Sequence, residues 1–187
     1  MGEFAIEDFS VTDVAGRPLE SAAISGERIH GRVLGLLEAS SLCSIATVTP
    51  ERTAHVNTAF FAYSDALEIF FLSHPMSQHC RHLRSNGSVA LTVFSSEQEW
   101  ADAGRGVQLF GTAEEVSGAA AREAERRYET RFPLYPAWRA SLTEDDVARE
   151  YRFYRIVVSR VKILDEAELG DGLVVRATIV RPERDGS

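Results

Sequence analysis

The sequence contains few of the residues that several common chemistries require. Lys162 is the only lysine in 187 residues, which excludes any reaction that needs a second one. The two cysteines, Cys43 and Cys80, lack the C-x-x-C spacing of zinc and redox sites, so a buried, reduced pair is favoured. No apolar run approaches the roughly 20 residues that span a bilayer. Residues 1–20 also lack the basic start and apolar core of a signal peptide, and the sequence predicts a cytoplasmic protein without a membrane partner.

Charge and motif content narrow the function further. The formal net charge of −8 at pH 7 argues against a nucleic-acid partner, because such binding needs a basic surface. The G-x-S-x-G, P-loop, H-E-x-x-H and dinucleotide-binding motifs are all absent. His79 and His82 have the i, i+3 spacing of metal ligands on a helix, but no second ligand pair accompanies them, so no metal is predicted. No acid/base pair stands out, and the catalytic residues stay unidentified.

Hydrophobic periodicity separates an N-terminal extension, residues 1–26, from a single domain, residues 27–187. This domain is expected to contain few helices and many short strands. The predicted helices cover residues 27–39, 77–85 and 119–131. The predicted strands cover residues 42–48, 55–63, 67–73, 89–94, 107–116, 151–163 and 173–180. A left-handed stop at Asn86-Gly87 is expected after the second helix, and a loop containing Tyr135 and Trp138 after the third.

Six or seven strands in meander-like order, with few helices between them, predict a mainly β (α+β) protein built on an antiparallel barrel or sandwich. A doubly wound sheet does not suit this order, because its parallel strands need crossover helices. Three successive strands carry apolar residues on both faces, as in Phe60-Phe61 and Phe70-Phe71. Such strands are covered on both sides, either by helices of the same chain or by a second subunit.

One local arrangement favours anion binding. The strand that ends at Ser73 is followed by a turn, residues 74–76, and by a helix that starts near Ser77. Helix N-termini present unpaired N–H groups and partial positive charge, so this corner suits a phosphate. The two serine hydroxyls and the guanidinium groups of Arg81 and Arg84 supply further donors. In the alternative interpretation, Ser77 only caps the helix and the arginines are solvated.

A resemblance to a known family starts at this corner. Residues 71–89 read F-L-S-H-P-M-S-Q-H-C-R-H-L-R-S-N-G-S-V. This run resembles the F-L-T-like triplet, short turn, S-R-K and N-L-x-x-N-P-x-V helix of the pyridoxamine 5′-phosphate oxidase-like family, the FMN-binding split β-barrels. Residues 106–116 similarly resemble the family's Q-x-x-G-x-x-E-x-V pattern, and the resemblance spans residues 28–163 in all. The R-F-P of residues 131–133 further resembles a small branch of the family without an assigned reaction.

The resemblance implies a six- to seven-stranded antiparallel split β-barrel with a few flanking helices, and a homodimer with FMN at the subunit interface. The strand from His55 to Ala59 would lie along the isoalloxazine ring, and Leu72 and Ser73 would border the ribityl phosphate. The S-R-K positions that bind the phosphate are here Ser77, Gln78 and His79. The full set of implied cofactor-binding residues is His55, Val56, Asn57, Thr58, Leu72, Ser73, Ser77, Gln78, His79, Arg81 and Gln108.

The implied function is that of an FMN-dependent oxidoreductase that acts on a small organic substrate by hydride transfer at flavin N5. The sequence departs from the family at Gln78 and His79, which replace two fixed charges by a neutral amide and a group that titrates near neutrality. Because a hydrogen bond to a charged group contributes about 1.5–3 kcal/mol, FMN binding is weakened unless Arg81 or an arginine of the second subunit compensates. The cofactor alternatives are a deazaflavin, haem or none. The functional alternatives are a non-catalytic haem-, flavin- or metabolite-binding barrel and a purely structural dimer.

Overall fold

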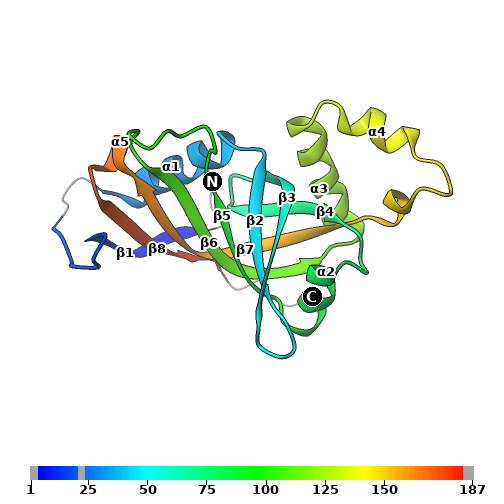
Figure 1. The fold of residues 1–187 in the computed structure, drawn as a ribbon, viewed down its shortest axis with the longest axis horizontal. Coiled ribbons are helices and arrows are strands. Elements are labelled where there is room, and N and C mark those ends of the chain that lie inside the picture. Colours follow the sequence, from blue (N-terminus) through cyan, green and yellow to red (C-terminus); the bar gives the residue numbers. More distant parts are fainter. Residues whose placement is uncertain (1–3, 21–23, 183–187) are drawn as a thin grey trace. The chain divides into compact units, whose positions relative to one another are not determined.

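The computed structural model describes residues 4–20 and 24–182. Figure 1 shows their helices and strands in chain order. The elements are β1 (Ala5–Asp13), α1 (Gly26–Glu38), β2 (Leu42–Val48), β3 (Ala54–Tyr63), β4 (Glu68–Ser73), α2 (Gln78–Ser85), β5 (Ser88–Val93), β6 (Arg105–Glu115), α3 (Gly118–Arg131), α4 (Tyr135–Ser141), the 3₁₀ helix η1 (Val147–Glu150), β7 (Arg152–Asp165), α5 (Glu166–Leu169) and β8 (Leu173–Val180). None of these helices is both long enough and apolar enough to cross a membrane.

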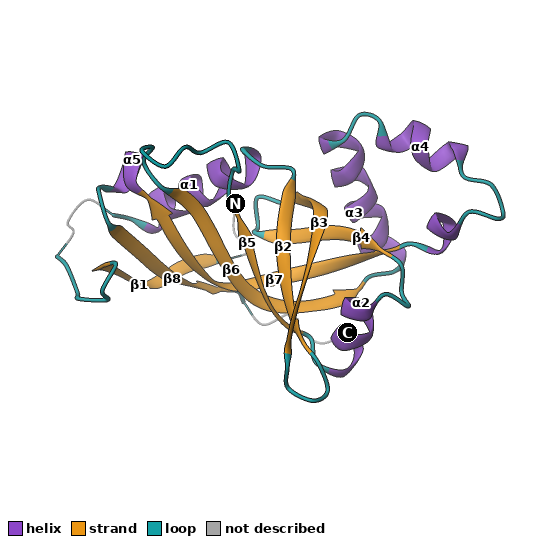
Figure 2. Ribbon diagram, in the orientation of Figure 1, coloured by secondary structure: helices purple, strands orange, loops and turns teal. Residues whose placement is uncertain are grey.

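The strands of the described residues form one sheet in the order β1-β8-β7-β4-β3-β2-β5-β6 (Figure 2). Strand β6 also pairs with β7, which closes six strands into a barrel and leaves β8 and β1 as two extra strands beside β7. The meander β2-β3-β4 consists of antiparallel neighbours, and β4 pairs antiparallel with β7. The predicted mainly β antiparallel barrel is therefore confirmed.

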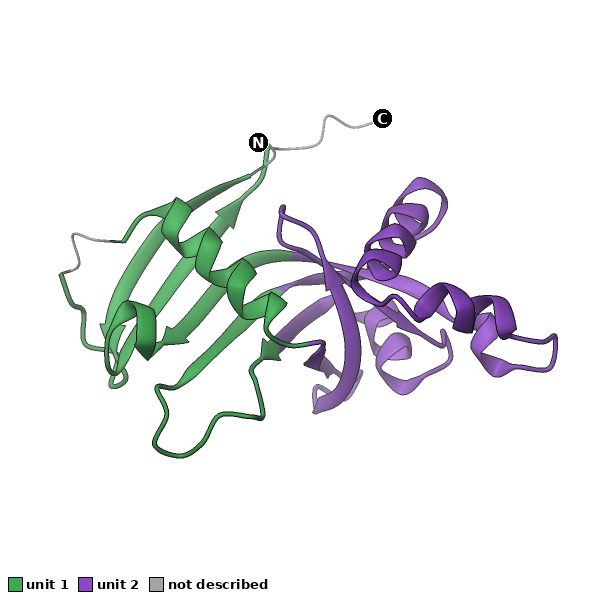
Figure 3. Ribbon diagram, turned by 90° about the horizontal axis from the view of Figure 1, so that it is seen from above, with its two compact units in different colours: residues 1–40, 92–110, 158–187 green, residues 41–91, 111–157 purple. Residues whose placement is uncertain are grey.

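The chain forms two compact units, which Figure 3 shows in different colours. The first unit comprises residues 1–40, 92–110 and 158–187, and the second comprises residues 41–91 and 111–157. The first unit contains α1, α5, β1 and β8. The second contains β2, β3, β4 and the helices α2, α3 and α4.

Helix α1 is held in the first unit by an apolar face and a buried ion pair. Its buried residues confirm the predicted amphipathic helix and are Ile29, Val33, Leu36 and Leu37. Arg32 reaches Asp165 at the end of β7, where Nε donates to Oδ2 at 3.0 Å and Nη2 donates to the same oxygen. The side chain of Asp165 is completely buried, so Arg32 neutralises a carboxylate that water does not reach.

The N-terminal extension contributes a strand that the sequence analysis did not predict. Strand β1 pairs antiparallel with β8, with Ala5 opposite Val180. The pairing register shifts around Asp8, whose φ of 46° is a conformation that Asp tolerates better than most residues. Most side chains of β1 are exposed, so the strand depends on backbone pairing and lacks a strong apolar alternation. Residues 1–3 and 21–23 of the extension lie outside the described part.

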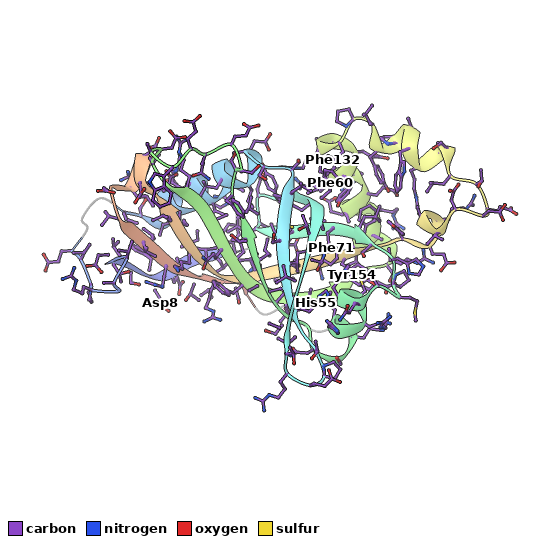
Figure 4. The ribbon with its side chains drawn as sticks, viewed as in Figure 1. Asp8, His55, Phe60, Phe71, Phe132 and Tyr154 are labelled. Carbon is purple, nitrogen blue, oxygen red and sulfur yellow. The ribbon has the colours of Figure 1, made fainter. Side chains whose placement is uncertain are left out.

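In the second unit, α3 packs on β3 and β4. The buried cluster between them consists of Ala62, Phe70, Val116, Ala124, Tyr128, Tyr135 and Phe153. Phe71 points to the other face of β4, where its ring stacks on Tyr154 at 5.1 Å (Figure 4). Both faces of β4 are thus covered, as the apolar pattern predicted, and the chain itself supplies the cover that the pattern left open between its own helices and a second subunit. Phe60 on β3 remains 57% exposed.

Two predictions for the segments that follow helices were wrong. The chain around Tyr135 and Trp138 forms helix α4 instead of a loop, and Pro136 lies in the first turn of α4, where its fixed φ and missing N–H are tolerated. Asn86 ends α2 in an extended conformation (φ −150°) instead of a left-handed one, with its N–H donating to the carbonyl of His82. Strand β5 starts at Ser88, so the chain leaves α2 directly into the sheet without a left-handed residue.

Candidate functional site

A pocket of about 680 Å³ lies in the second unit. Its volume falls within the range of roughly 300–1,000 Å³ that is usual for small-ligand pockets. All of its lining residues belong to the second unit. They are Leu42, Asn57, Thr58, Ala59, Phe60, Leu72, Ser73, His79, Tyr128, Phe132, Leu134, Tyr135, Trp138 and Tyr151.

Ser73 and His79 line the pocket and form, with the adjacent Ser77, a polar cluster that we name the serine–histidine corner. His79 Nε2 lies 2.8 Å from Ser73 Oγ and 3.2 Å from Ser77 Oγ, and the two hydroxyl oxygens are 3.3 Å apart. Ser73 ends β4 and Ser77 is the N-cap residue of α2. The Ser77 side chain makes no capping bond to the helix backbone. Its hydroxyl therefore belongs to the corner, which is more than a helix cap.

Three histidines gather around this corner. The rings of His55 and His82 meet edge to face at 5.1 Å, and Thr47 Oγ1 lies 3.1 Å from Nδ1 of His82 and 3.5 Å from Nδ1 of His55. Burial, together with the electrostatic effect of His55 and His82, lowers the pKa of His79 to about 4. His79 is therefore neutral near pH 7. In residues 4–20 and 24–182 no group of three His, Cys, Asp or Glu side chains is arranged to hold a metal ion.

Strand β3 contributes the pocket residues next to this corner. Asn57, Thr58 and Ala59 line the pocket, and the buried Asn57 Oδ1 has no hydrogen-bond partner in the described residues. A buried carbonyl oxygen without a partner is costly, so Asn57 marks a place where an N–H of a ligand would be favourable. His55 contacts the histidine group and is not a lining residue, and Val56 is 62% exposed.

Six of the eleven predicted cofactor-binding residues lie outside the pocket lining, namely His55, Val56, Ser77, Gln78, Arg81 and Gln108. Gln78 and Arg81 are exposed, and Arg81 Nη1 donates to the carbonyl of Met76 at 2.8 Å. Arg84 Nη1 donates to the carbonyl of Pro75 at 2.8 Å, so both guanidinium groups stabilise the turn that leads into α2. Gln108 is an exposed residue of β6 in the first unit. The predicted residues that the structure does bring together at the pocket are Asn57, Thr58, Leu72, Ser73, Ser77 and His79.

The contribution of α3 to the apolar part of the pocket was not predicted from the sequence. We name this apolar part the aromatic wall, and it consists of Tyr128, Phe132, Leu134, Tyr135 and Trp138. The ring of Phe132 also meets the ring of Phe60 edge to face at 5.7 Å (Figure 4). The available signal was the run of aromatic residues after position 127, but α3 is otherwise rich in Ala, Glu and Arg. That composition is typical of a solvated helix and concealed its contribution to the pocket.

Tyr128 joins the aromatic wall to the sheet, and its removal is expected to cost stability. Its hydroxyl donates to the carbonyl of Phe60 at 2.5 Å and accepts from the N–H of Leu72 at 3.2 Å. Tyr128→Phe leaves both backbone groups without this partner and should lower the free energy of unfolding by about 1–3 kcal/mol, measured by urea denaturation. Tyr151→Phe is the control, with an expected change within about 0.5 kcal/mol. Equal losses in both variants would contradict this role.

A split barrel with a pocket that is polar at one end is the class of protein that the fold and the site define. The family model described as Pyridoxamine 5′-phosphate oxidase matches residues 29–165. That match covers well over half of the chain, and the protein belongs to this family. No curated protein matches the sequence.

Solved structures share the fold at low sequence identity. A protein of unknown function from Agrobacterium tumefaciens is 19% identical with a TM-score of 0.60, and the match covers 78% of this chain and 59% of that one. A heme-binding protein from Mycobacterium smegmatis is 15% identical with a TM-score of 0.61, covering 81% and 57%. An FAD-binding protein from Mesorhizobium loti is 18% identical with a TM-score of 0.51, covering 78% and 91%. The chain thus spans less than two thirds of the first two, and these likenesses show the fold alone.

Proposed function

We propose that the pocket binds FMN and that the protein is an FMN-dependent oxidoreductase of the pyridoxamine 5′-phosphate oxidase type, acting on a small organic substrate. One observation carries this proposal: a single pocket is lined both by Ser73 and His79 of the serine–histidine corner and by Asn57, whose buried Oδ1 has no partner in the described residues. Hydroxyl and imidazole groups donate to phosphate oxygens, and an amide oxygen accepts from an N–H on the edge of a flat heterocycle. Membership of the family supports the same ligand.

The residues of the pocket fit the parts of FMN. Asn57, Thr58 and Ala59 on β3 would meet the polar edge of the ring, while Leu72 and Ser73 would border the ribityl phosphate. When bound, FMN supplies a hydride-accepting position at N5. The chain's own residues bind and orient the ring, and the aromatic wall excludes water from it. This division of work agrees with the lack of a recognisable acid/base pair in the sequence.

The serine–histidine corner differs from the phosphate site of the family in its charge, because two cationic positions are here Gln78 and His79. The residues that line the pocket include neither lysine nor arginine. Arg81 and Arg84 are engaged by carbonyl groups of the turn before α2. Within one chain the phosphate is therefore held by hydrogen bonds from Ser73, Ser77 and His79 without a fixed cation, and we expect a weaker affinity than two cationic donors provide.

The aromatic wall indicates the class of substrate and the need for a partner. Its lining residues carry no charge, so the space beside the ring favours a flat, uncharged organic molecule. Several apolar side chains that line the pocket are exposed, with Leu134 at 83%, Phe60 at 57% and Leu42 at 43%. Exposed apolar groups that cluster at a pocket favour cover by a second copy of the chain. A homodimer with FMN at the interface is therefore part of the proposal.

FMN binding and reduction test the proposal directly. Titration of the purified protein into FMN should quench the flavin fluorescence with a saturable curve at micromolar protein. The bound flavin should then lose its visible absorbance on anaerobic addition of a nicotinamide donor, and regain it with an organic acceptor. Unchanged FMN fluorescence would remove the proposal. Flavin that binds but is never reduced by such donors would support the non-catalytic alternative.

Haem binding without turnover is the second candidate. The observation that favours it is a neutral His79 imidazole beside a mostly apolar pocket, because a neutral histidine is a common axial ligand of haem iron. The neighbour from Mycobacterium smegmatis is a heme-binding protein. Added haem should then give a Soret band that His79→Ala shifts and that FMN competes away. A haem spectrum identical with and without the protein would exclude this candidate.

A further inference from the structure

His79 faces the pocket without a fixed positive charge beside it. The lining residues include no lysine and no arginine, and the two guanidinium groups of α2 donate to the carbonyls of Pro75 and Met76. A dianionic phosphate at this corner would meet a neutral imidazole and the hydroxyls of Ser73 and Ser77. Such a site either holds the anion weakly or draws in a proton to balance its charge.

We propose, on the basis of the FMN site above, that the serine–histidine corner is a proton-coupled site for a phosphate monoester. The phosphate is held together with one additional proton, which its oxygen shares with His79 Nε2 and which the empty corner lacks. The affinity for FMN would then fall as the pH rises. A lysine or arginine at this position would not give this dependence, because its charge does not need an added proton.

The hydrogen bonds of the corner suit both states. When the neutral ring carries its proton on Nδ1, Nε2 is an acceptor for the hydroxyls of Ser73 and Ser77, whose oxygens lie 2.8 and 3.2 Å away. Once the proton is shared, Nε2 is a donor, and the two hydroxyl hydrogens are released to turn towards phosphate oxygens. Rotation of two hydroxyl groups is enough for this change, so no backbone movement is needed.

The nearest groups explain why the empty corner holds no proton. His55 from β3 and His82 from α2 both disfavour a positive charge on His79, after burial itself. Phe71 of β4 adds an apolar ring with its centre 6.1 Å from that of His79. Thr47 of β2 bonds to the other two histidines and supplies no charge. Only an incoming anion changes this balance in favour of the protonated form.

The remaining charged groups near the corner do not line the pocket. His74 pairs with Glu150 at 3.2 Å, and Glu51 in the β2–β3 loop interacts with His82. Arg81 and Arg84 on α2 are exposed. Tyr128 and Tyr151 also line the pocket, and burial raises the pKa of Tyr128, so that this group stays neutral. None of these groups places a carboxylate in the pocket lining, where it would hold the proton without a ligand.

A phosphate monoester is the ligand class that matches such a corner. Its second pKa is about 6, so near neutral pH it arrives mostly as the dianion and is able to accept one proton. Removal from water into a neutral corner raises its affinity for that proton. In the complex the proton belongs to the phosphate–imidazole pair and not to either group alone.

Calorimetry of FMN binding measures the proton directly. Titrations at about pH 7.5, in two buffers with different ionisation enthalpies, should show that close to one proton is taken up per FMN bound. The dissociation constant should accordingly rise up to about tenfold per pH unit above neutrality. Riboflavin, which lacks the phosphate, is the control ligand. It should bind without proton uptake and with a dissociation constant that does not change with pH.

Two variants assign the proton to the corner. His79→Lys places a fixed cation at the same position, so FMN should bind at about pH 8 at least roughly tenfold more tightly than to the wild type, with no proton uptake. His74→Gln removes a nearby histidine that does not line the pocket, and the uptake should persist. The wild-type calorimetry decides the question even where a variant fails to fold.

The outcomes separate this inference from the proposed function. FMN binding with the same heat in both buffers would overturn the inference alone, and so would equal affinities for FMN and riboflavin. Uptake that disappears in His74→Gln would assign the proton to the pair with Glu150 and likewise overturn it. If neither flavin binds, the proposed function fails and the inference fails with it.

Discussion

Replacing Ser73 and Ser77 together with alanine is expected to weaken FMN binding by roughly two to four orders of magnitude. Both hydroxyls lie within hydrogen-bond distance of His79 at the pocket. Each hydrogen bond from a hydroxyl to a charged phosphate contributes about 1.5–3 kcal/mol, and each 1.4 kcal/mol is about a tenfold change in affinity. Fluorescence titration with FMN measures the loss, and the affinity for riboflavin should stay close to that of the wild type.

The matched control is Ser85→Ala. Ser85 lies in the last turn of α2, where its hydroxyl donates to the carbonyl of His82 at 2.8 Å. This variant removes a serine hydroxyl from the same helix without touching the corner, so its FMN affinity should change less than about twofold. If the double variant bound FMN as tightly as Ser85→Ala does, the phosphate would have to lie elsewhere, and the corner would only order the start of α2.

The largest expected loss of stability follows from breaking the pair of Arg32 and Asp165. Asp165 is completely buried, and its Oδ2 accepts from both Nε and Nη2 of Arg32. Arg32→Met leaves a buried carboxylate without its partner, which should lower the free energy of unfolding by about 3–5 kcal/mol. Urea denaturation at neutral pH measures this loss.

The double variant Arg32→Met, Asp165→Leu is the control for this pair. Removing both charges takes away the uncompensated carboxylate, so most of the lost stability should return, as is usual when a buried pair is replaced by apolar residues of similar size. A single variant as stable as the wild type would mean that the pair is solvated in solution. A double variant as unstable as the single one would point to lost packing and not to charge.

The strands of the meander could be predicted because their signal lies in adjacent residues. Phe70 and Phe71 are buried on opposite faces of β4, and the sequence showed both as apolar. Strand β1 gave no such signal, since most of its side chains are exposed and its pairing with β8 involves backbone groups that every residue has. Local patterns therefore identify strands with buried faces and miss those that only extend a sheet edge.

The candidate site likewise has a part that the sequence predicted and a part that it did not. Ser73, Ser77 and His79 lie within seven consecutive positions, so a strand, a turn and the start of a helix were enough to expect them together. The sequence did not predict where the Arg81 side chain points. Whether its guanidinium group meets a ligand or the carbonyl of Met76 depends on the path of the turn. The contact of Thr47 with His82 joins residues 35 positions apart and left no local trace.

The amino-acid sequence by itself determined that the chain forms an antiparallel barrel or sandwich and that a polar corner follows the third strand of the meander. These features depend on apolar alternation and on the chemistry of neighbouring residues, which act over a few positions. Only the tertiary structure decided that α3 and α4 supply an aromatic wall, that the guanidinium groups of α2 bind the turn, and that His55 and His82 surround His79. Those outcomes depend on which distant segments pack together, and the pKa of the half-buried His79 imidazole depends on the sum of such neighbours.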